Sequence, residues 1–107
     1  MALLFLDLNG FRKVNDEHGH AAGGSILQQF ARRLRACIRT SDTACRYGGD
    51  EFVVLLPELE GRESAAAAAR KIRARLAVPY IVDGVEITVT ASIGVVSIRS
   101  TDASTAT

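Results

Sequence analysis

Two acidic residues directly follow a pair of glycines near the middle of this sequence. Gly48 and Gly49 are flanked by residues typical of strands, a pattern that predicts a two-residue hairpin turn in which both glycines take positive φ. Asp50 and Glu51 come next and precede the apolar run Phe52–Leu56. Carboxylates at the mouth of a buried strand either stay solvated at the turn or bind a cation, and the turn alone leaves both interpretations open.

A third carboxylate occupies a similar place near the N-terminus. Asp7 follows the continuous apolar run Ala2–Leu6, which predicts a strand buried on both faces. The runs Ala2–Leu6 and Phe52–Leu56 are the most apolar in the chain, so we expect them to be neighbours at the centre of one sheet. Asp7 and Asp50 would then meet at one end of it. Two carboxylates on rigid neighbouring strands can hold Mg²⁺ or Mn²⁺, which predicts phosphoryl-transfer or nucleotidyl-transfer chemistry.

Other side chains that could bind a metal ion carry weaker signals. His18 and His20 flank a glycine and are interpreted as turn residues, with a metal-ligand role as the less favoured alternative. Cys37 and Cys45 lack metal-ligand spacing and indicate reduced, packed thiols of a cytosolic protein.

The composition is that of one globular domain. The chain has 107 residues, of which 48% are hydrophobic and 23% charged. Its formal net charge of +1 gives no indication of a nucleic-acid or membrane surface. Asp7 interrupts the apolar N-terminus far short of a membrane span or signal peptide. We therefore expect a cytoplasmic domain, although its parent protein can still be attached to a membrane.

Two longer helices are predicted from the spacing of apolar residues. Ser25–Arg39 is the clearer one, and Ser25 with Gln28 fits a capping box, with a start nearer Ala21 as the alternative. Ser64–Ala77 has a thin buried side that lets it lie close to a sheet. The two stripes comprise Ile26, Phe30, Leu34 and Ile38 in the first helix, and Ala65, Ala69, Ile72 and Leu76 in the second.

Hairpins complete the predicted fold. An Asp-Gly turn joins Tyr80–Val82 to a long alternating strand over Val85–Val95, and Phe11–Glu17 is a short helical turn. The order of elements indicates an α+β fold, with helices flanking a central, mostly antiparallel sheet. We expect the domain core to cover residues 1–99 and a flexible tail to cover residues 100–107, which are rich in serine, threonine and alanine.

Several of these stretches carry a family resemblance. Residues 47–52, Tyr-Gly-Gly-Asp-Glu-Phe, resemble the signature of GGDEF domains, the diguanylate cyclases of bacteria. Residues 5–16, followed by Gly19-His20, resemble that family's first strand and nucleotide loop, and residues 92–95 also fit. The resemblance spans residues 2–98 and implies the palm-like fold of nucleotidyl cyclases.

The resemblance implies that two GTP molecules are condensed into cyclic di-GMP with release of two pyrophosphates. Each subunit of a homodimer presents one GTP, and the 3′-hydroxyl of one attacks the α-phosphate of the other. Asp50 and Glu51 match the catalytic positions, and the metal ligands match Asp7, the Leu8 carbonyl and Asp50. The residues matched to GTP binding are Gly10, Phe11 and Arg12 at the triphosphate, Asn15 at guanine, and Gly48 and Gly49 close to the nucleotide.

A second ligand site follows from the same resemblance. Arg39 and Asp42 lie at the family's spacing before the signature for a site at which the product, cyclic di-GMP, inhibits the enzyme. The next helix offers Arg70 and Lys71 as a further basic residue, and we assign Arg70.

The sequence departs from the family pattern in three respects. Gly24 stands where the family has an aspartate that reads guanine, and Asn9 stands where an acid usually follows Asp7. The family's leading helix is not found, nor is its closing helix, whose lysine and arginine contact the phosphates. We therefore expect the helix side of the sheet to lack a cover, with Val96 and Ile98 exposed there.

Two functions of different classes remain. The first is a diguanylate cyclase, favoured by the intact Asp7, Asp50 and Glu51. The second is a degenerate domain that binds GTP or cyclic di-GMP and regulates a partner, favoured by Gly24 and the missing helices. The resemblance further implies sensory or phosphodiesterase domains attached in the parent protein, and nothing indicates a nucleic-acid partner.

Overall fold

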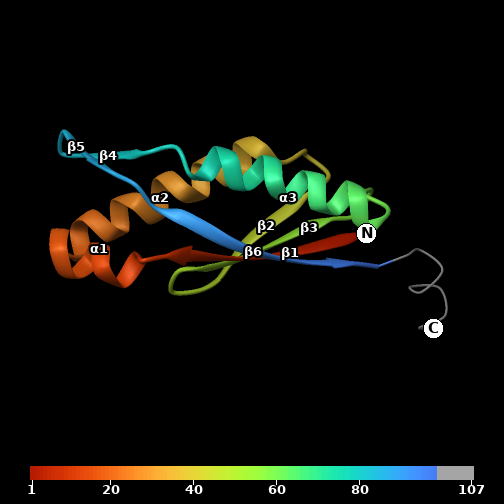
Figure 1. Ribbon diagram of the computed structural model, residues 1–107, viewed down its shortest axis with the longest axis horizontal. Helices are drawn as coiled ribbons and strands as arrows, with labels where there is room; N and C mark the ends of the chain where they lie inside the picture. The colour runs from red at the N-terminus through yellow and green to blue at the C-terminus, as the bar shows by residue number, and fades with distance from the viewer. Residues whose placement is uncertain (99–107) are drawn as a thin grey trace.

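The computed structural model describes residues 1–98, which form a layer of helices on one four-stranded antiparallel sheet (Figure 1). The strands are β1 (Ala2–Asn9), β2 (Thr43–Gly48), β3 (Glu51–Leu56) and β6 (Thr90–Ser97), in the spatial order β2-β3-β1-β6. The helices are α1 (Phe11–His18), α2 (His20–Cys37) and α3 (Arg62–Leu76). The predicted α+β class is confirmed, while the predicted tail over residues 100–107 lies outside the described residues.

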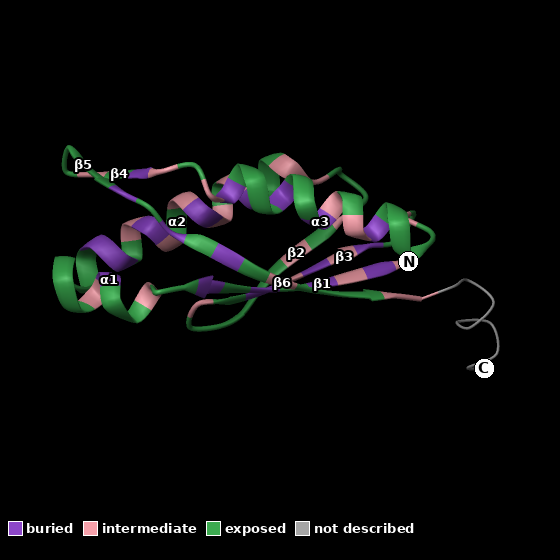
Figure 2. Cartoon of the chain, viewed as in Figure 1, coloured by how far each residue is buried: buried purple, intermediate pink, exposed green. Residues whose placement is uncertain are grey.

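The strand β1 is the centre of the sheet. It pairs antiparallel with β3 on one side and β6 on the other, which confirms that the two most apolar strands are neighbours. Burial alternates along it (Figure 2), with Ala2, Leu4, Leu6 and Leu8 buried under the helices. Phe5, on the opposite face, is 47% exposed. The prediction of burial on both faces is therefore wrong, because the helices cover only one face.

The hydrophobic core lies between the sheet and the helices α2 and α3. The Phe30 ring of α2 packs against the Phe52 ring of β3, with a centroid distance of 5.0 Å. The predicted buried stripe of α3 is confirmed, and its two small residues, Ala65 and Ala69, allow the helix to approach the sheet closely. The buried residues of α3 are Ala65, Ala69, Ile72 and Leu76.

Helix α2 begins earlier than the capping pattern indicated. Gly19, with a φ of 90°, separates α1 from α2, so the alternative start nearer Ala21 is the better one. Ser25 consequently lies inside the helix, where its hydroxyl accepts a hydrogen bond from Gln29 Nε2 at 3.2 Å. The predicted capping box is wrong, and the helix ends at Cys37 because the next residue is extended.

The turn between β2 and β3 differs from the predicted two-glycine turn. Gly48 belongs to β2 and lies opposite Glu51, so Gly49 and Asp50 are the turn residues. Of these residues only Gly49 has a positive φ, of 44°. The register between the two strands shifts around Tyr47, and this irregularity moves the turn by one residue.

The second hairpin is separate from the main sheet. It consists of β4 (Tyr80–Val82) and β5 (Val85–Ile87), which pair only with each other in the described part of the chain. The predicted strand over Val85–Val95 is therefore interrupted, since Thr88 and Val89 fall between β5 and β6. The predicted alternation holds at the buried residues Ile87, Val89 and Ala91.

Arg33 of α2 anchors this hairpin. Its guanidinium donates hydrogen bonds to the carbonyls of Val78 and Pro79, and it lies 3.8 Å from the centre of the Tyr80 ring. The Tyr80 hydroxyl, which is buried, donates to the Leu76 carbonyl at 2.8 Å. Burial raises the pKa of Tyr80 above its ordinary value of 10.0, and the neighbouring positive charge of Arg33 opposes part of that shift.

The sheet face opposite the helices is apolar and uncovered by the residues described. Phe5 and Val96 are 47% and 44% exposed there, and Val96 lies opposite Leu3 in the strand pairing. Exposure of Val96 was predicted on the helix side, but Val96 lies on the opposite face. On the helix side Val95, opposite the buried Leu4, is 40% exposed, so the helices leave part of β6 uncovered. Ile98 is only half-buried, and its backbone N–H donates to the Met1 carbonyl at 2.7 Å. Among residues 1–98, none of the helices has the length and hydropathy needed to cross a membrane.

Candidate active site

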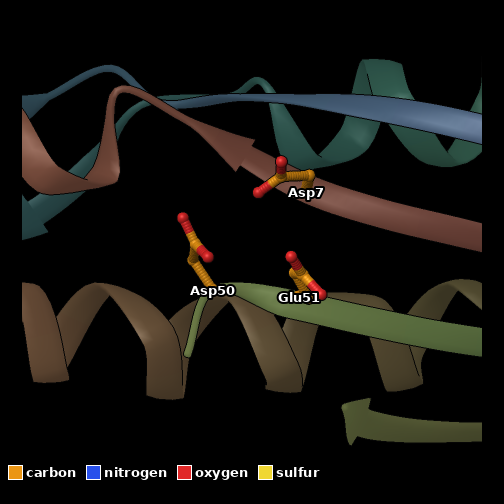
Figure 3. A group of neighbouring side chains, drawn as sticks. All are labelled: Asp7, Asp50 and Glu51. Atoms are coloured by element: carbon orange, nitrogen blue, oxygen red, sulfur yellow. The ribbon is translucent and has the colours of Figure 1, made fainter. Parts of the chain in front are cut away.

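Three carboxylates come together at one end of β1 and β3 (Figure 3). Asp7 lies within β1, Glu51 is the first residue of β3, and Asp50 lies in the turn before it. Oxygen atoms of the three side chains lie within 4.8 Å of one another. The predicted approach of Asp7 and Asp50 is confirmed. Glu51 joins them because it lies directly opposite Asp7 in the strand pairing.

The backbone fixes the separation of these acids. The N–H of Leu8 donates to the carbonyl of Asp50 at 3.2 Å, which ties the turn to the central strand. Asp7 is paired on both sides, with Glu51 in β3 and Ser92 in β6. Asp7 is therefore held by strand pairing on both of its sides.

The electrostatics of the cluster favour a bound cation. Asp7 and Glu51 are exposed and Asp50 is half-buried, and none of the ion pairs formed within residues 1–98 involves any of the three. Like charges directly opposite each other on neighbouring strands are destabilising. An all-oxygen set of carboxylates is what Mg²⁺ and Mn²⁺ prefer, whereas zinc favours nitrogen and sulfur ligands. The residues present thus fit the predicted metal.

The loop after β1 offers backbone donors near the acids. Gly10 connects β1 to α1 with a φ of 74°, a conformation that favours glycine, and its carbonyl accepts the Val14 N–H at 3.1 Å. Phe11 and Arg12 form the first turn of α1, where backbone N–H groups have no partner within the helix. Asp7 precedes this turn by only a few residues, so free donors and carboxylates are close together along the chain.

The two positions predicted to contact or read the base lie in α1 and in α2. Asn15 is half-buried, and its side chain packs against Gly23. Gly24 lines a groove of about 560 Å³ between α2 and β2, in which Gln28, Arg35 and other residues take part. Asp and Glu are missing from the described lining of this groove, so it supplies no carboxylate to a ligand.

A smaller hollow of about 130 Å³ brings together part of the predicted inhibitory site. Arg39 and Asp42 both line it, and Asp42 Oδ2 accepts a hydrogen bond from the Arg39 backbone N–H at 2.8 Å. Helix α3 contributes Lys71 to the lining, whereas Arg70 is not among the lining residues. Ala68 lines the same hollow and lies three residues before Lys71, so the two residues share one side of α3.

The remaining predicted site residues surround the hairpin turn. A Cβ atom added at Gly48 or Gly49 would meet nothing within 4 Å, so open space surrounds both glycines. A hollow of about 410 Å³ lies beside the acids, lined by Asp7 and Glu51 together with apolar side chains such as Phe5. The site therefore combines carboxylates, open space and an apolar wall.

A protein-family model described as diguanylate cyclase, GGDEF domain, matches residues 1–107. The chain belongs to the GGDEF domain family. It is 47% identical over 96 residues to the bifunctional diguanylate cyclase/cyclic di-GMP phosphodiesterase MucR of Pseudomonas aeruginosa, a match that covers 88% of this chain and 14% of that protein. Relatives of this GGDEF chain are thus parts of multidomain proteins, some of which carry phosphodiesterase activity by name.

Solved structures agree with this assignment. The crystal structure of the GGDEF domain of TpbB (YfiN) from P. aeruginosa superposes with a TM-score of 0.84 at 40% identity, covering 88% of this chain and 59% of that one. The GGDEF domain of DgcB from Caulobacter crescentus, solved in complex with c-di-GMP, gives a TM-score of 0.79 at 26% identity, with coverages of 88% and 57%. The present chain spans less than two thirds of each of these relatives.

Proposed function

We propose that this GGDEF chain is the nucleotide-condensing part of a diguanylate cyclase, which converts two GTP molecules into cyclic di-GMP. The observation that carries the proposal is the meeting of the Asp7, Asp50 and Glu51 carboxylates within 4.8 Å on adjacent strands. Such a cluster of unpaired acids is destabilising by itself, and it is explained if its role is to hold a divalent cation beside phosphate groups.

The acids and the neighbouring carbonyl form the metal site in this proposal. Asp7, Asp50 and the Leu8 carbonyl hold Mg²⁺ or Mn²⁺, and Glu51 adds a third carboxylate to the same cluster. A bound divalent ion would offset the negative charge that develops on the phosphoryl oxygens during transfer. The backbone hydrogen bond from Leu8 to Asp50 holds the end of β1 beside the hairpin turn, so the ligands on these two segments stay close together.

The nucleotide lies across the loop and the two helices that follow it. Backbone N–H groups of Gly10, Phe11 and Arg12 bind the triphosphate, because the first turn of a helix presents unpaired donors to an anion. Asn15 contacts the base, since a carboxamide can both donate to and accept from a purine edge. The open space around Gly48 and Gly49 allows the nucleotide to approach the turn closely.

The reaction requires two copies of the domain, each presenting one GTP. The 3′-hydroxyl oxygen of one nucleotide forms a bond to the α-phosphorus of the other, and the bond from that phosphorus to the bridging oxygen of pyrophosphate breaks. Each step releases one pyrophosphate and one proton from the attacking hydroxyl. Two such steps close the ring, so two pyrophosphates leave for every cyclic di-GMP.

The direct test is product formation by the 107-residue chain. We expect cyclic di-GMP and pyrophosphate to appear in a ratio of one to two when GTP and Mg²⁺ are supplied, and Asp50→Asn to lower the rate at least about a hundredfold. Glu63→Gln, which changes an exposed carboxylate of α3, serves as the matched control and should leave the rate unchanged. Magnesium-dependent GTP binding without any product would contradict the enzymatic proposal.

That last outcome would instead support a second candidate, a regulatory module that binds GTP or cyclic di-GMP. The observation in its favour is Gly24, which leaves the groove beside α2 without the carboxylate that the family uses to read guanine. A module of this kind would act on an attached domain in the cytoplasm, such as the phosphodiesterase named in MucR. Product binding at the Arg39 and Asp42 hollow is compatible with both candidates.

A further inference from the structure

Two adjacent glycines of α2 have opposite surroundings. A Cβ atom added at Gly23 would overlap the side-chain oxygen Oδ1 of Asn15 and lie 2.9 Å from its Cγ and 3.3 Å from Cζ of Phe11. A Cβ atom added at Gly24 would meet nothing within 4 Å. Position 23 therefore has room for a side chain only if the Asn15 carboxamide moves aside, whereas position 24 has ample room.

Backbone conformation does not explain the glycine at position 23. Gly23 lies inside α2 and is not among the residues with positive φ, so an alanine could adopt the same backbone conformation. Glycine within a helix is destabilising by roughly 0.5–1 kcal/mol relative to alanine. The structure instead gives Gly23 a specific contact, since the absence of its side chain makes space for Asn15.

This contact restricts the direction of the Asn15 carboxamide. Phe11 and Asn15 are four residues apart in α1 and therefore lie on the same side of it, facing Gly23. A carboxamide on an open surface turns freely about its last torsion, which is broad and roughly two-fold. Packing against the backbone of Gly23 removes much of that freedom for the half-buried Asn15.

We infer that Gly23 is a positioning residue for base recognition. Because Gly23 has no side chain, the Asn15 carboxamide packs against α2 and points in the direction in which it contacts the purine. The inference rests on the proposed role of Asn15 in the GTP site. It concerns the base and not the phosphates, because the triphosphate donors start at Gly10 and the metal ligands lie on β1 and the hairpin turn.

The test compares Gly23→Ala with Gly94→Ala, which adds the same methyl group on β6, away from the proposed base site. We expect Gly23→Ala to weaken GTP binding by about three- to tenfold, the effect of losing about one neutral hydrogen bond. Gly94→Ala should change it less than about twofold, because the nearest atom to its added Cβ is Cβ of Phe5 at 4.0 Å, an ordinary contact. Magnesium-dependent binding of inorganic tripolyphosphate, which has no base, should be the same in both variants. A general disturbance of the fold would weaken the binding of both GTP and tripolyphosphate.

A double-mutant cycle with Asn15→Ala tests the contact independently of any nucleotide. Gly23→Ala should lower the melting temperature when Asn15 is present, and it should no longer do so in the Asn15→Ala background, where the overlapping atoms are gone. The cycle remains informative if Gly23→Ala alone folds poorly, because the double variant relieves the overlap. In GTP binding, the double variant should be no weaker than Asn15→Ala alone.

The possible failures are distinguishable. Equal losses of GTP affinity in Gly23→Ala and Gly94→Ala, or an unaltered affinity in Gly23→Ala, would overturn the positioning role while leaving the proposed function intact. Failure of the wild-type chain to bind GTP would overturn the proposed function and with it any role in base recognition. The melting temperatures would still decide whether Gly23 seats Asn15.

Discussion

Leu8 and Asp50 are joined by a backbone hydrogen bond of 3.2 Å, although one lies in the central strand and the other in a hairpin turn 42 residues later in the numbering of the chain. This bond places the carboxylates of Asp7 and Asp50 at the same end of the sheet. If this pair binds a metal ion as proposed, binding should depend on the sheet pairing and on each of the two acids.

The first prediction concerns metal-dependent nucleotide binding. Asp50→Ala should lower the affinity for a non-hydrolysable GTP analogue at least about tenfold in the presence of Mg²⁺, because one carboxylate ligand is lost. Without Mg²⁺ the variant and the wild type should bind equally weakly. Calorimetric titration of both proteins, with and without the metal, provides the measurement. If the two proteins bind the analogue with equal affinity in the presence of Mg²⁺, Asp50 is not a ligand of the metal ion.

A second prediction uses stability alone. In the absence of divalent metal, Asp7→Asn should raise the melting temperature slightly, because it relieves repulsion from Glu51 directly opposite. Addition of Mg²⁺ should stabilise the wild type more than the variant and so reduce or reverse that difference. Thermal melts over a series of Mg²⁺ concentrations would measure this difference in melting temperature. If the melting temperature of the wild type does not change on addition of Mg²⁺, the acids bind no metal ion without a nucleotide.

The third prediction concerns the hollow that contains Arg39 and Asp42. Lys71→Ala and Arg39→Ala should each weaken cyclic di-GMP binding about fivefold or more, because both cationic side chains line the hollow and the ligand carries two phosphates. Arg70→Ala is the matched control, since Arg70 is the adjacent exposed cation of α3 and is not among the lining residues. If Arg70→Ala weakens cyclic di-GMP binding more than Lys71→Ala does, Arg70 belongs to the product site, as assigned from the sequence.

These outcomes show which parts of the molecule the sequence could predict. The central strands followed from uninterrupted apolar runs, and the approach of Asp7 to Asp50 followed from pairing those strands. The start of α2 did not follow, because its first turn carries small residues and no apolar stripe, and Gly19 sets the boundary through its φ of 90°. The contact of a surface cation such as Lys71 depends on how α3 is rotated on the sheet, which packing decides.

The hairpin turn illustrates the same limit at the site itself. Two consecutive glycines indicated a turn centred on both, yet Gly48 is paired in β2 and only Gly49 has positive φ. The register shift around Tyr47 arises from the pairing of β2 with β3, which is a tertiary effect without a local sequence signal. Glu51 was assigned to the catalytic positions from the sequence, but its place directly opposite Asp7 comes from the pairing of β1 with β3, which only the structure gives.

The fourth prediction concerns pH. Burial raises the pKa of Tyr80, so its neutral form contributes stability that is fully present below the unfolded value of 10.0 and is lost as the pH rises through the folded pKa. Tyr80→Phe should cost about 1 kcal/mol at pH 8, where the hydrogen bond to the Leu76 carbonyl is lost. Above pH 10 that difference should shrink, because only the wild type is then destabilised further.

Urea unfolding at pH 8 and at about pH 11 measures the two stabilities. Tyr47→Phe is the control, since Tyr47 is 77% exposed and its hydroxyl should affect stability little at either pH. If the difference in unfolding free energy between the wild type and Tyr80→Phe is the same at both pH values, burial does not raise the pKa of Tyr80.

The last prediction concerns the choice of base. An aspartate at the position of Gly24 would accept hydrogen bonds from the ring N–H and amino group of guanine, and glycine offers no such acceptor. A hydrogen bond to a charged group contributes roughly 1.5–3 kcal/mol, so its absence should weaken GTP binding about tenfold to a hundredfold. The same change removes a negative charge that would repel the acceptor N1 of adenine. Asn15 remains, and its carboxamide can serve either purine. The wild-type chain should therefore bind ATP and GTP within about tenfold of each other.

Gly24→Asp should restore a preference for GTP, and the structure leaves room for it because a Cβ atom at that position meets nothing within 4 Å. Gly24→Asn separates shape from charge, since the amide has the same size as the acid but carries a donor in place of one acceptor oxygen. We expect the asparagine variant to remain nearly unselective, while the aspartate variant gains about tenfold or more for GTP over ATP. Competition of ATP against GTP in the three proteins is the measurement. If the wild type already prefers GTP by far more than tenfold, and Gly24→Asp leaves that ratio unchanged, then another residue reads the base, and the groove beside α2 is not where the purine edge is recognised.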